Sequence, residues 1–190
     1  IERSQNSEGG WRYNPVPYDA DVSVTICQIM ALRSARNAGL EVPKEVIDRA
    51  VEYVRKCQNV DGGFKYQLNS GFSAWPRSAA GVASLYYAGI YSDDAIDKGV
   101  TYLLESAMPG SANVPAAHYY YGHYYAVQAY YTAGGDRFKN YFRTIRDLLL
   151  RMQQANGAWQ CNTGPGDAFA TAVSALILQI PYQYLPIFQR

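Results

Sequence analysis

Two acidic residues that could perform acid–base chemistry, Asp19 and Asp21, lie just before the first helix that the sequence predicts. A carboxyl group can act as a general acid or base, which makes both residues candidates for catalysis. Aspartate in front of a helix also accepts hydrogen bonds from the first free backbone N–H groups. Capping is the more common role at such a position, and the sequence leaves both interpretations open.

A tyrosine-rich segment at 118–131 could line a binding site. Seven of the 18 tyrosines of the chain fall within these fourteen residues, together with both histidines. Aromatic rings with polar tips suit an apolar ligand and can stabilise cationic intermediates. The same rings could instead fill space between helices and hydrogen-bond one another. This segment provides five substrate-binding candidates: His118, Tyr119, Tyr120, His123 and Tyr124.

Three more residues are expected at the rim of the same site. Trp75 and Arg77 lie at the start of one predicted helix, and Asp167 lies at the start of another. If the starts of these helices gather at one end of the protein, the three side chains surround a ligand there with Asp19 and Asp21. We therefore include Trp75, Arg77 and Asp167 among the substrate-binding candidates.

The residues that bind metals in other proteins are poorly spaced here. Cys27, Cys57 and Cys161 are odd in number and far apart, which argues against a disulfide framework. No histidine follows Cys161, and His118 and His123 are five residues apart, on different faces of a helix. The sequence therefore predicts no metal site, and no cofactor is expected.

The elements that position these residues come from an internal repeat. A glutamine followed by a glycine and an aromatic residue occurs three times, at 5–11, 58–64 and 153–159. Gly9 and Gly62 are 53 residues apart, and Gly62 and Gly157 are 95 apart, close to two periods of about 48. We expect one altered copy between them, near Gly110.

A second marker, Ala-Gly, alternates with the first at 38–39, 88–89 and 133–134. Each Ala-Gly ends a stretch of helical length, so every period contains two helices. Helices rich in small residues are expected at about 22–38, 77–88, 117–133 and 167–180. Amphipathic helices with one charged face are expected from Pro43 onward, at 94–106 and at 136–154.

This alternation predicts an all-α fold. Helices that are small and apolar on most sides belong in an inner ring, and those with a charged face belong outside it, which describes an α/α toroid. Seven helices make only part of such a ring, and the 5–11 segment has the form of the end of a unit. We therefore expect one domain over 1–190, the C-terminal part of a longer toroid, whose open edge is covered by a missing N-terminal segment or by a homodimer.

Composition excludes several classes of partner. The chain has 190 residues, 48% of them hydrophobic and 17% charged, and a net charge of +1 without a basic run. A soluble protein with one core is expected, and nucleic acid is not an expected partner. The longest apolar stretch, 168–180, is interrupted by polar residues and too short to cross a bilayer.

With its glutamine and glycine-aromatic repeat, best formed at 50–64 and weaker at 148–159, the chain resembles the terpenoid cyclase and protein prenyltransferase superfamily. The resemblance covers essentially the whole sequence and is closest to squalene-hopene cyclases, whose catalytic aspartic acid lies in an Asp-x-Asp-Asp-Thr motif. Here the matching segment reads Asp21-Val22-Ser23-Val24-Thr25, so serine and valine replace the two central acids.

The resemblance implies a protein that binds an isoprenoid or other apolar ligand in a central aromatic cavity. Asp19 and Asp21 are the acids that could replace the missing pair if the motif were shifted. Two other functions stay open: a non-catalytic helical-repeat interaction module, and a toroidal enzyme that acts on polysaccharides, with acidic, basic and aromatic residues at its rim.

Overall fold

The computed structural model describes residues 1–69, 71–106, 108–111 and 117–185. Within these residues it has seven α-helices and no strand longer than an isolated bridge. The predictions of an all-α fold and of seven helices are therefore confirmed. The helices are α1 (Val22–Asn37), α2 (Lys44–Lys56), α3 (Trp75–Tyr87), α4 (Asp94–Ser106), α5 (Tyr119–Ala133), α6 (Gly135–Met152) and α7 (Asp167–Gln179).

The predicted helix boundaries hold to within about two residues, with α3 as the clearest difference. That helix begins at Trp75 rather than at Arg77, and Pro76 lies in its first turn. Proline fits there because the first backbone N–H groups of a helix have no partner within the helix. Short 3-10 helices at Glu2–Ser4 and Ile180–Tyr182 complete the regular structure of the described residues.

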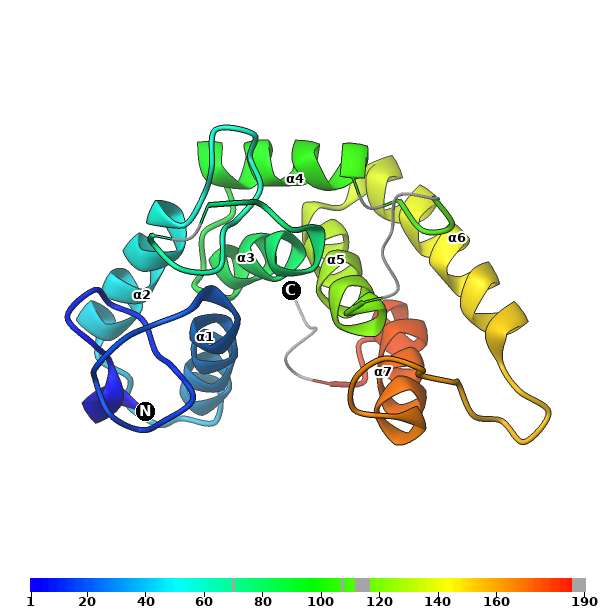
Figure 1. Cartoon of the computed structure of the whole chain (residues 1–190), viewed down its shortest axis with the longest axis horizontal. Coiled ribbons are helices and arrows are strands. Elements are labelled where there is room, and N and C mark those ends of the chain that lie inside the picture. Colours follow the sequence, from blue (N-terminus) through cyan, green and yellow to red (C-terminus); the bar gives the residue numbers. More distant parts are fainter. Residues whose placement is uncertain (70, 107, 112–116, 186–190) are drawn as a thin grey trace.

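The seven helices form an open arc with two layers (Figure 1). Helices α1, α3, α5 and α7 pack against one another in sequence order along the inner side. Helices α2, α4 and α6 lie on the outer side, and each contacts the inner helices before and after it. The residue types explain the layers, because α3 buries 12 of its 13 residues whereas α2 keeps its charged residues in solvent.

The three glutamine-containing segments form closely similar turns, which we call the first (5–11), second (58–64) and third (153–159) glutamine turns. In each, the glutamine amide donates to the carbonyl of the glycine four residues later, at 2.8 to 2.9 Å. That glycine has a positive φ of +84° to +98° in all three turns, a conformation that side chains with a Cβ rarely adopt. The repeat in the sequence is therefore a repeat in structure.

Each glutamine turn is also attached to the inner helix that follows it. The backbone N–H groups of Trp11, Phe64 and Trp159 donate to hydroxyl groups of Thr25, Ser78 and Thr171, at 2.8 to 3.1 Å. These three aromatic side chains are almost completely buried. Hydrogen bonding and aromatic burial together fix the position of each turn on α1, α3 and α7.

Candidate functional site

Asp21, the first of the predicted catalytic residues, caps α1. Its Oδ1 accepts a hydrogen bond from the Val24 N–H at 2.9 Å, and the side chain is fully buried. Its Oδ2 has no hydrogen-bond partner among the described residues and lies 3.6 Å from Arg12 Nε. Burial raises the pKa of the Asp21 carboxyl, and the Val24 N–H and the Arg12 charge offset only part of that rise.

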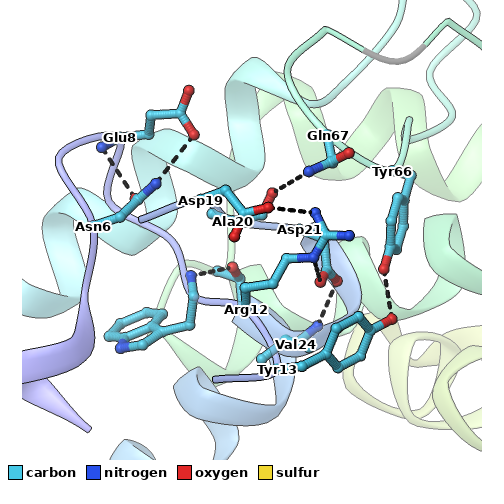
Figure 2. A network of polar contacts seen from close by, with 12 residues as sticks. Asn6, Glu8, Arg12, Tyr13, Asp19, Ala20, Asp21, Val24, Tyr66 and Gln67 are labelled. Carbon is cyan, nitrogen blue, oxygen red and sulfur yellow. Dashed lines mark hydrogen bonds and ion pairs between the residues drawn. The ribbon is translucent and has the colours of Figure 1, made fainter. Parts of the chain in front are cut away.

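Arg12 contacts both acids, as Figure 2 shows. Its Nη1 bonds Asp19 Oδ2 at 2.8 Å, and its guanidinium lies 5.4 Å and 5.6 Å from the ring centres of Tyr13 and Tyr66. The hydroxyl groups of these two tyrosines are 2.6 Å apart. Asp19 and Asp21 are thus both engaged by Arg12, and Asp21 also holds the start of a helix.

Arg77 fixes the loop in front of α3. Its Nε donates to the Phe64 carbonyl at 2.9 Å, and its Nη2 donates to the Phe72 carbonyl at 2.5 Å. The guanidinium is half-buried, and desolvation lowers its pKa. The residue that we predicted to bind substrate is therefore bonded to two backbone carbonyls of its own chain.

Trp75 and His123 lie in an aromatic cluster between the inner and outer layers. Their ring centres are 4.9 Å apart, and His123 Nδ1 is 2.6 Å from the Tyr141 hydroxyl on α6. His123 is fully buried, and burial lowers its pKa to about 3, so the imidazole is neutral at physiological pH. Gly122 leaves room for Trp75, because a Cβ at Gly122 would lie only 2.1 Å from the indole ring.

Tyr124 directly follows His123 in α5, so its side chain leaves the helix on a different side. Its ring is 5.0 Å from that of Tyr125, whose hydroxyl is 3.8 Å from the Cys27 thiol on α1. Tyr124 is half-buried. The tyrosine-rich helix thus presents one aromatic group to the other inner helices and another, around His123, to α6.

A pocket of about 620 Å³ lies beside the start of α5. Three of the predicted substrate-binding residues, His118, Tyr119 and Tyr120, form one wall. The opposite wall is the loop between α6 and α7. The described residues that line the pocket are mostly apolar or aromatic and include no lysine, arginine, aspartate or glutamate: Ala117, His118, Tyr119, Tyr120, Tyr121, Met152, Gln160, Cys161, Asn162, Thr163, Gly164, Pro165 and Phe169.

Two hydrogen bonds hold the loop that closes this pocket. Asp167, the first residue of α7, accepts from the Cys161 N–H at 2.8 Å. The Tyr120 hydroxyl donates to the Gln160 carbonyl at 2.8 Å. Asp167 does not line the pocket, but its hydrogen bond holds the loop that forms one wall. The hydrogen bond of Tyr120 links the two walls.

A second pocket of about 560 Å³ lies on the other side of the α5 start, between α3 and α4. Trp75 and His118 both line it, with Glu105 and Tyr102 from α4. His118 and Ala117 belong to both pockets, so the start of α5 separates them. Four of the eight predicted binding residues therefore line pockets, Trp75, His118, Tyr119 and Tyr120, whereas Arg77, His123, Tyr124 and Asp167 do not.

Sequence reasoning did not select Met152, Cys161 and Phe169, which line the larger pocket. The segment Gly164-Pro165-Gly166 was a usable signal, because it predicts an irregular loop beside the start of an inner helix. No group of three or more potential metal ligands occurs in the part of the chain that the structure describes. None of the described helices is long and apolar enough to cross a membrane.

The comparisons with protein-family models and with curated proteins found no match to this chain.

Proposed function

We propose that the chain is part of an α/α toroid of the terpenoid cyclase and protein prenyltransferase type, and that it binds an isoprenoid or similarly apolar molecule. The alternation of inner and outer helices around an open arc supports the toroid. The glutamine turns, which attach each unit to the next inner helix, support the same assignment.

The observation that carries the proposed ligand class is the pocket of about 620 Å³ beside α5. Aromatic rings and the apolar side chains of Met152 and Phe169 face a volume large enough for an apolar chain. Because no Lys, Arg, Asp or Glu of the described residues lines the pocket, an uncharged isoprenoid fits it better than a diphosphate, which needs cations to balance its charge.

We propose binding without acid-initiated cyclisation. An acid that protonates an alkene must face the bound alkene. Asp19 and Asp21 are held by Arg12, and neither lines this pocket. Burial does keep the pKa of Asp21 above the usual value, but its Oδ1 accepts a backbone N–H, which is the arrangement of a helix cap.

The direct test is calorimetric titration of the chain with farnesol and with farnesyl diphosphate. We expect farnesol to bind and the diphosphate to bind at least about tenfold more weakly, as burying an unpaired charge is costly. Asn162→Trp should fill the pocket and abolish binding, whereas Asn140→Trp, an exposed residue on α6, should leave it unchanged. Equal binding of farnesol by both variants would disprove the pocket assignment.

A separate incubation with squalene and linear polyprenyl diphosphates tests turnover. We expect mass spectrometry to recover these compounds unchanged. Cyclic products that disappear in an Asp21→Asn variant would overturn the assignment of Asp21 to structure alone.

A non-catalytic interaction module is the second candidate function. A specific observation favours it: the outward side of α7 exposes Ala168, Ala172 and Ala175 to solvent. Partner binding there and ligand binding beside α5 involve different residues, so they can be tested separately.

A further inference from the structure

The first and second glutamine turns each hold the start of an outer helix. Gln5 Nε2 donates both to Gly9 O and, at 2.9 Å, to the Val46 carbonyl in the first turn of α2. Gln58 Nε2 donates in the same way to the Ala95 carbonyl of α4, at 2.8 Å. In both cases one amide group bonds its own turn and an incoming helix.

The glycines of these turns allow the outer helix to approach closely. A Cβ at Gly9 would lie 2.3 Å from the Arg49 carbonyl oxygen of α2, and a Cβ at Gly62 would lie 2.4 Å from that of Lys98 in α4. Any side chain there would overlap with helix backbone, which cannot move aside as the end of a side chain can. In the first and second turns, the glutamine donor and the glycine, which has no side chain, therefore form a surface that fits one helix.

The third glutamine turn has the same internal geometry but holds none of the outer helices that the structure describes. Gln153 Nε2 donates to Gly157 O at 2.9 Å, and Gly157 has φ +84°. Among the described residues, Gln153 bonds no second carbonyl, and the only atom within 4 Å of a Cβ at Gly157 is Gln153 Nε2 itself. Both residues are exposed, whereas Gln5 and Gly9 are buried.

The neighbouring face of α7 is uncovered in the same way. The hydroxyl groups of three residues accept hydrogen bonds from the three turns, and these residues occupy equivalent positions on the inner helices: Thr25, Ser78 and Thr171. One and four residues later lie Ile26 and Ile29 on α1 and Ala79 and Val82 on α3, all buried. The equivalent residues on α7, Ala172 and Ala175, are exposed.

Beside the second glutamine turn, the outer helix α4 covers the equivalent face of α3. A Cβ at Gly99 of α4 would lie 2.4 Å from Val82 Cγ2, so the two helices are in direct contact at this position. The exposed alanines of α7 and the unfilled third turn thus belong to one surface, which we call the C-terminal edge: Gln153, Gly157, Ala172 and Ala175.

We propose that the C-terminal edge binds the first turn of an amphipathic α-helix of the outer type, supplied by a partner with the same helical-hairpin repeat. The edge continues the row of two interfaces that the chain already forms with α2 and α4. Those helices define the partner: a free backbone carbonyl near its start, an apolar side of small or branched residues, and a charged outer side.

Among the helices that the structure describes, a second copy of this chain offers none of this kind. The first turns of α2 and α4 are already bonded to Gln5 and Gln58. The apolar side of α6, with Tyr141, Ile145 and Leu149, is buried in its own chain. Self-association through this edge is therefore an alternative that the experiment must exclude.

The probe is a peptide with the sequence of residues 93–106, because α4 fills the equivalent position in the second unit. A lactam bridge between Asp97 and a lysine introduced by Thr101→Lys keeps it helical, and both positions are exposed. Pre-forming the helix removes the cost of nucleating it, so weak helicity cannot hide binding. The bridged peptide is titrated into the 190-residue chain, with a bridged peptide of scrambled sequence as control.

We expect saturable binding with one peptide per chain and none with the scrambled peptide. Gly157→Ala should weaken binding at least about tenfold, because its Cβ would meet the helix backbone. Gln153→Ala should weaken it about fivefold, the effect of one lost hydrogen bond. Lys139→Ala, an exposed residue at the far end of α6, should leave binding unchanged.

Hydrogen exchange locates the bound peptide. Backbone amides in 153–159 and 168–176 should gain protection, and those around the α5 pocket should not. Absence of binding at millimolar bridged peptide would overturn the proposal, as would binding that Gly157→Ala leaves unchanged. A concentration-dependent dimer in sedimentation that buries residues 153–159 would overturn it in favour of a second copy. None of these outcomes depends on whether the chain binds farnesol.

Discussion

The second and third glutamine turns have the same internal hydrogen bonds and different surroundings. Gln58 bonds both Gly62 O and the carbonyl of Ala95 in α4, whereas Gln153 bonds only Gly157 O among the described residues. The conformation of the turn is therefore a local property of its sequence. What the turn contributes to stability depends on whether a helix lies against it.

The largest difference is expected between the glycines of these two turns. Gly62→Ala should lower the free energy of unfolding by about 3 kcal/mol, since it combines an unfavourable positive φ with overlap of its Cβ and the Lys98 carbonyl. Gly157→Ala introduces only the unfavourable positive φ, without an overlap, and should lower the free energy of unfolding by about 1 kcal/mol. Urea unfolding of both variants measures the difference. Equal losses would mean that the outer helix contributes nothing at the second turn.

In the hairpin that ends at the third turn, α5 and α6 share the aromatic cluster around His123 and Tyr141. Burial lowers the pKa of His123 to about 3, so the unfolded chain binds more protons than the folded chain between about pH 6.5 and 3. The stability due to the neutral imidazole is complete above pH 6.5 and is lost as the pH falls. The loss should reach about 1.4 kcal/mol per pH unit.

Two substitutions isolate this effect from that of other acid-titrating groups. His123→Asn keeps an acceptor for the Tyr141 hydroxyl without a titrating ring, so its unfolding free energy should fall less steeply below pH 6.5 than that of the wild type. Asn140→Ala alters an exposed residue of α6 without a titrating side chain and should retain the wild-type slope. If the wild type and His123→Asn had the same slope, His123 would not be buried in its neutral form.

Removing the glutamines should give a smaller difference of the same kind. Gln58→Ala loses two hydrogen bonds in a partly buried position and should destabilise the chain by about 2 kcal/mol. Gln153→Ala loses one exposed bond and should cost about 0.5 kcal/mol. Chemical denaturation at pH 7 separates these values, and a loss at Gln153 as large as that at Gln58 would show that the third turn is already covered.

The smallest effect is expected at Asp21, in the first unit. Burial raises the pKa of this carboxyl, so the charged form is less favourable in the folded chain, and stability falls as the pH rises through the folded pKa. Asp21→Asn keeps a side-chain oxygen for the Val24 N–H and should unfold at or slightly above the wild-type denaturant midpoint at pH 7. Asp21→Ala loses the cap and should cost about 1 kcal/mol. A marked loss in Asp21→Asn would mean that the Arg12 ion pair outweighs desolvation.

Periodic features were predictable from the sequence because they repeat. The positive-φ glycines and the alternation of small-residue and amphipathic helices each leave a recurring pattern, and the observed helices follow it closely. The capping position of Asp21 was also among the stated alternatives, since aspartate before a helix commonly caps it.

The assignment of individual binding residues was less predictable, and α5 shows why. Tyrosine and histidine occur on every side of this helix, so no amphipathic pattern indicates which side faces inward. Packing decides it: Gly122 admits the indole of Trp75, His123 lies against Tyr141 of α6, and Tyr125 lies near Cys27 of α1.

The sequence by itself determined the turns and helices, because backbone conformation and burial on one face are set by neighbouring residues within a few positions. Only the tertiary structure decided that Arg12 covers Asp21 and that the 160–165 loop closes a pocket with the start of α5. It also decided that Gln58 holds an outer helix, whereas Gln153 bonds none of the helices in the described part of the chain. These contacts join residues far apart in the chain, and their geometry depends on how whole helices pack.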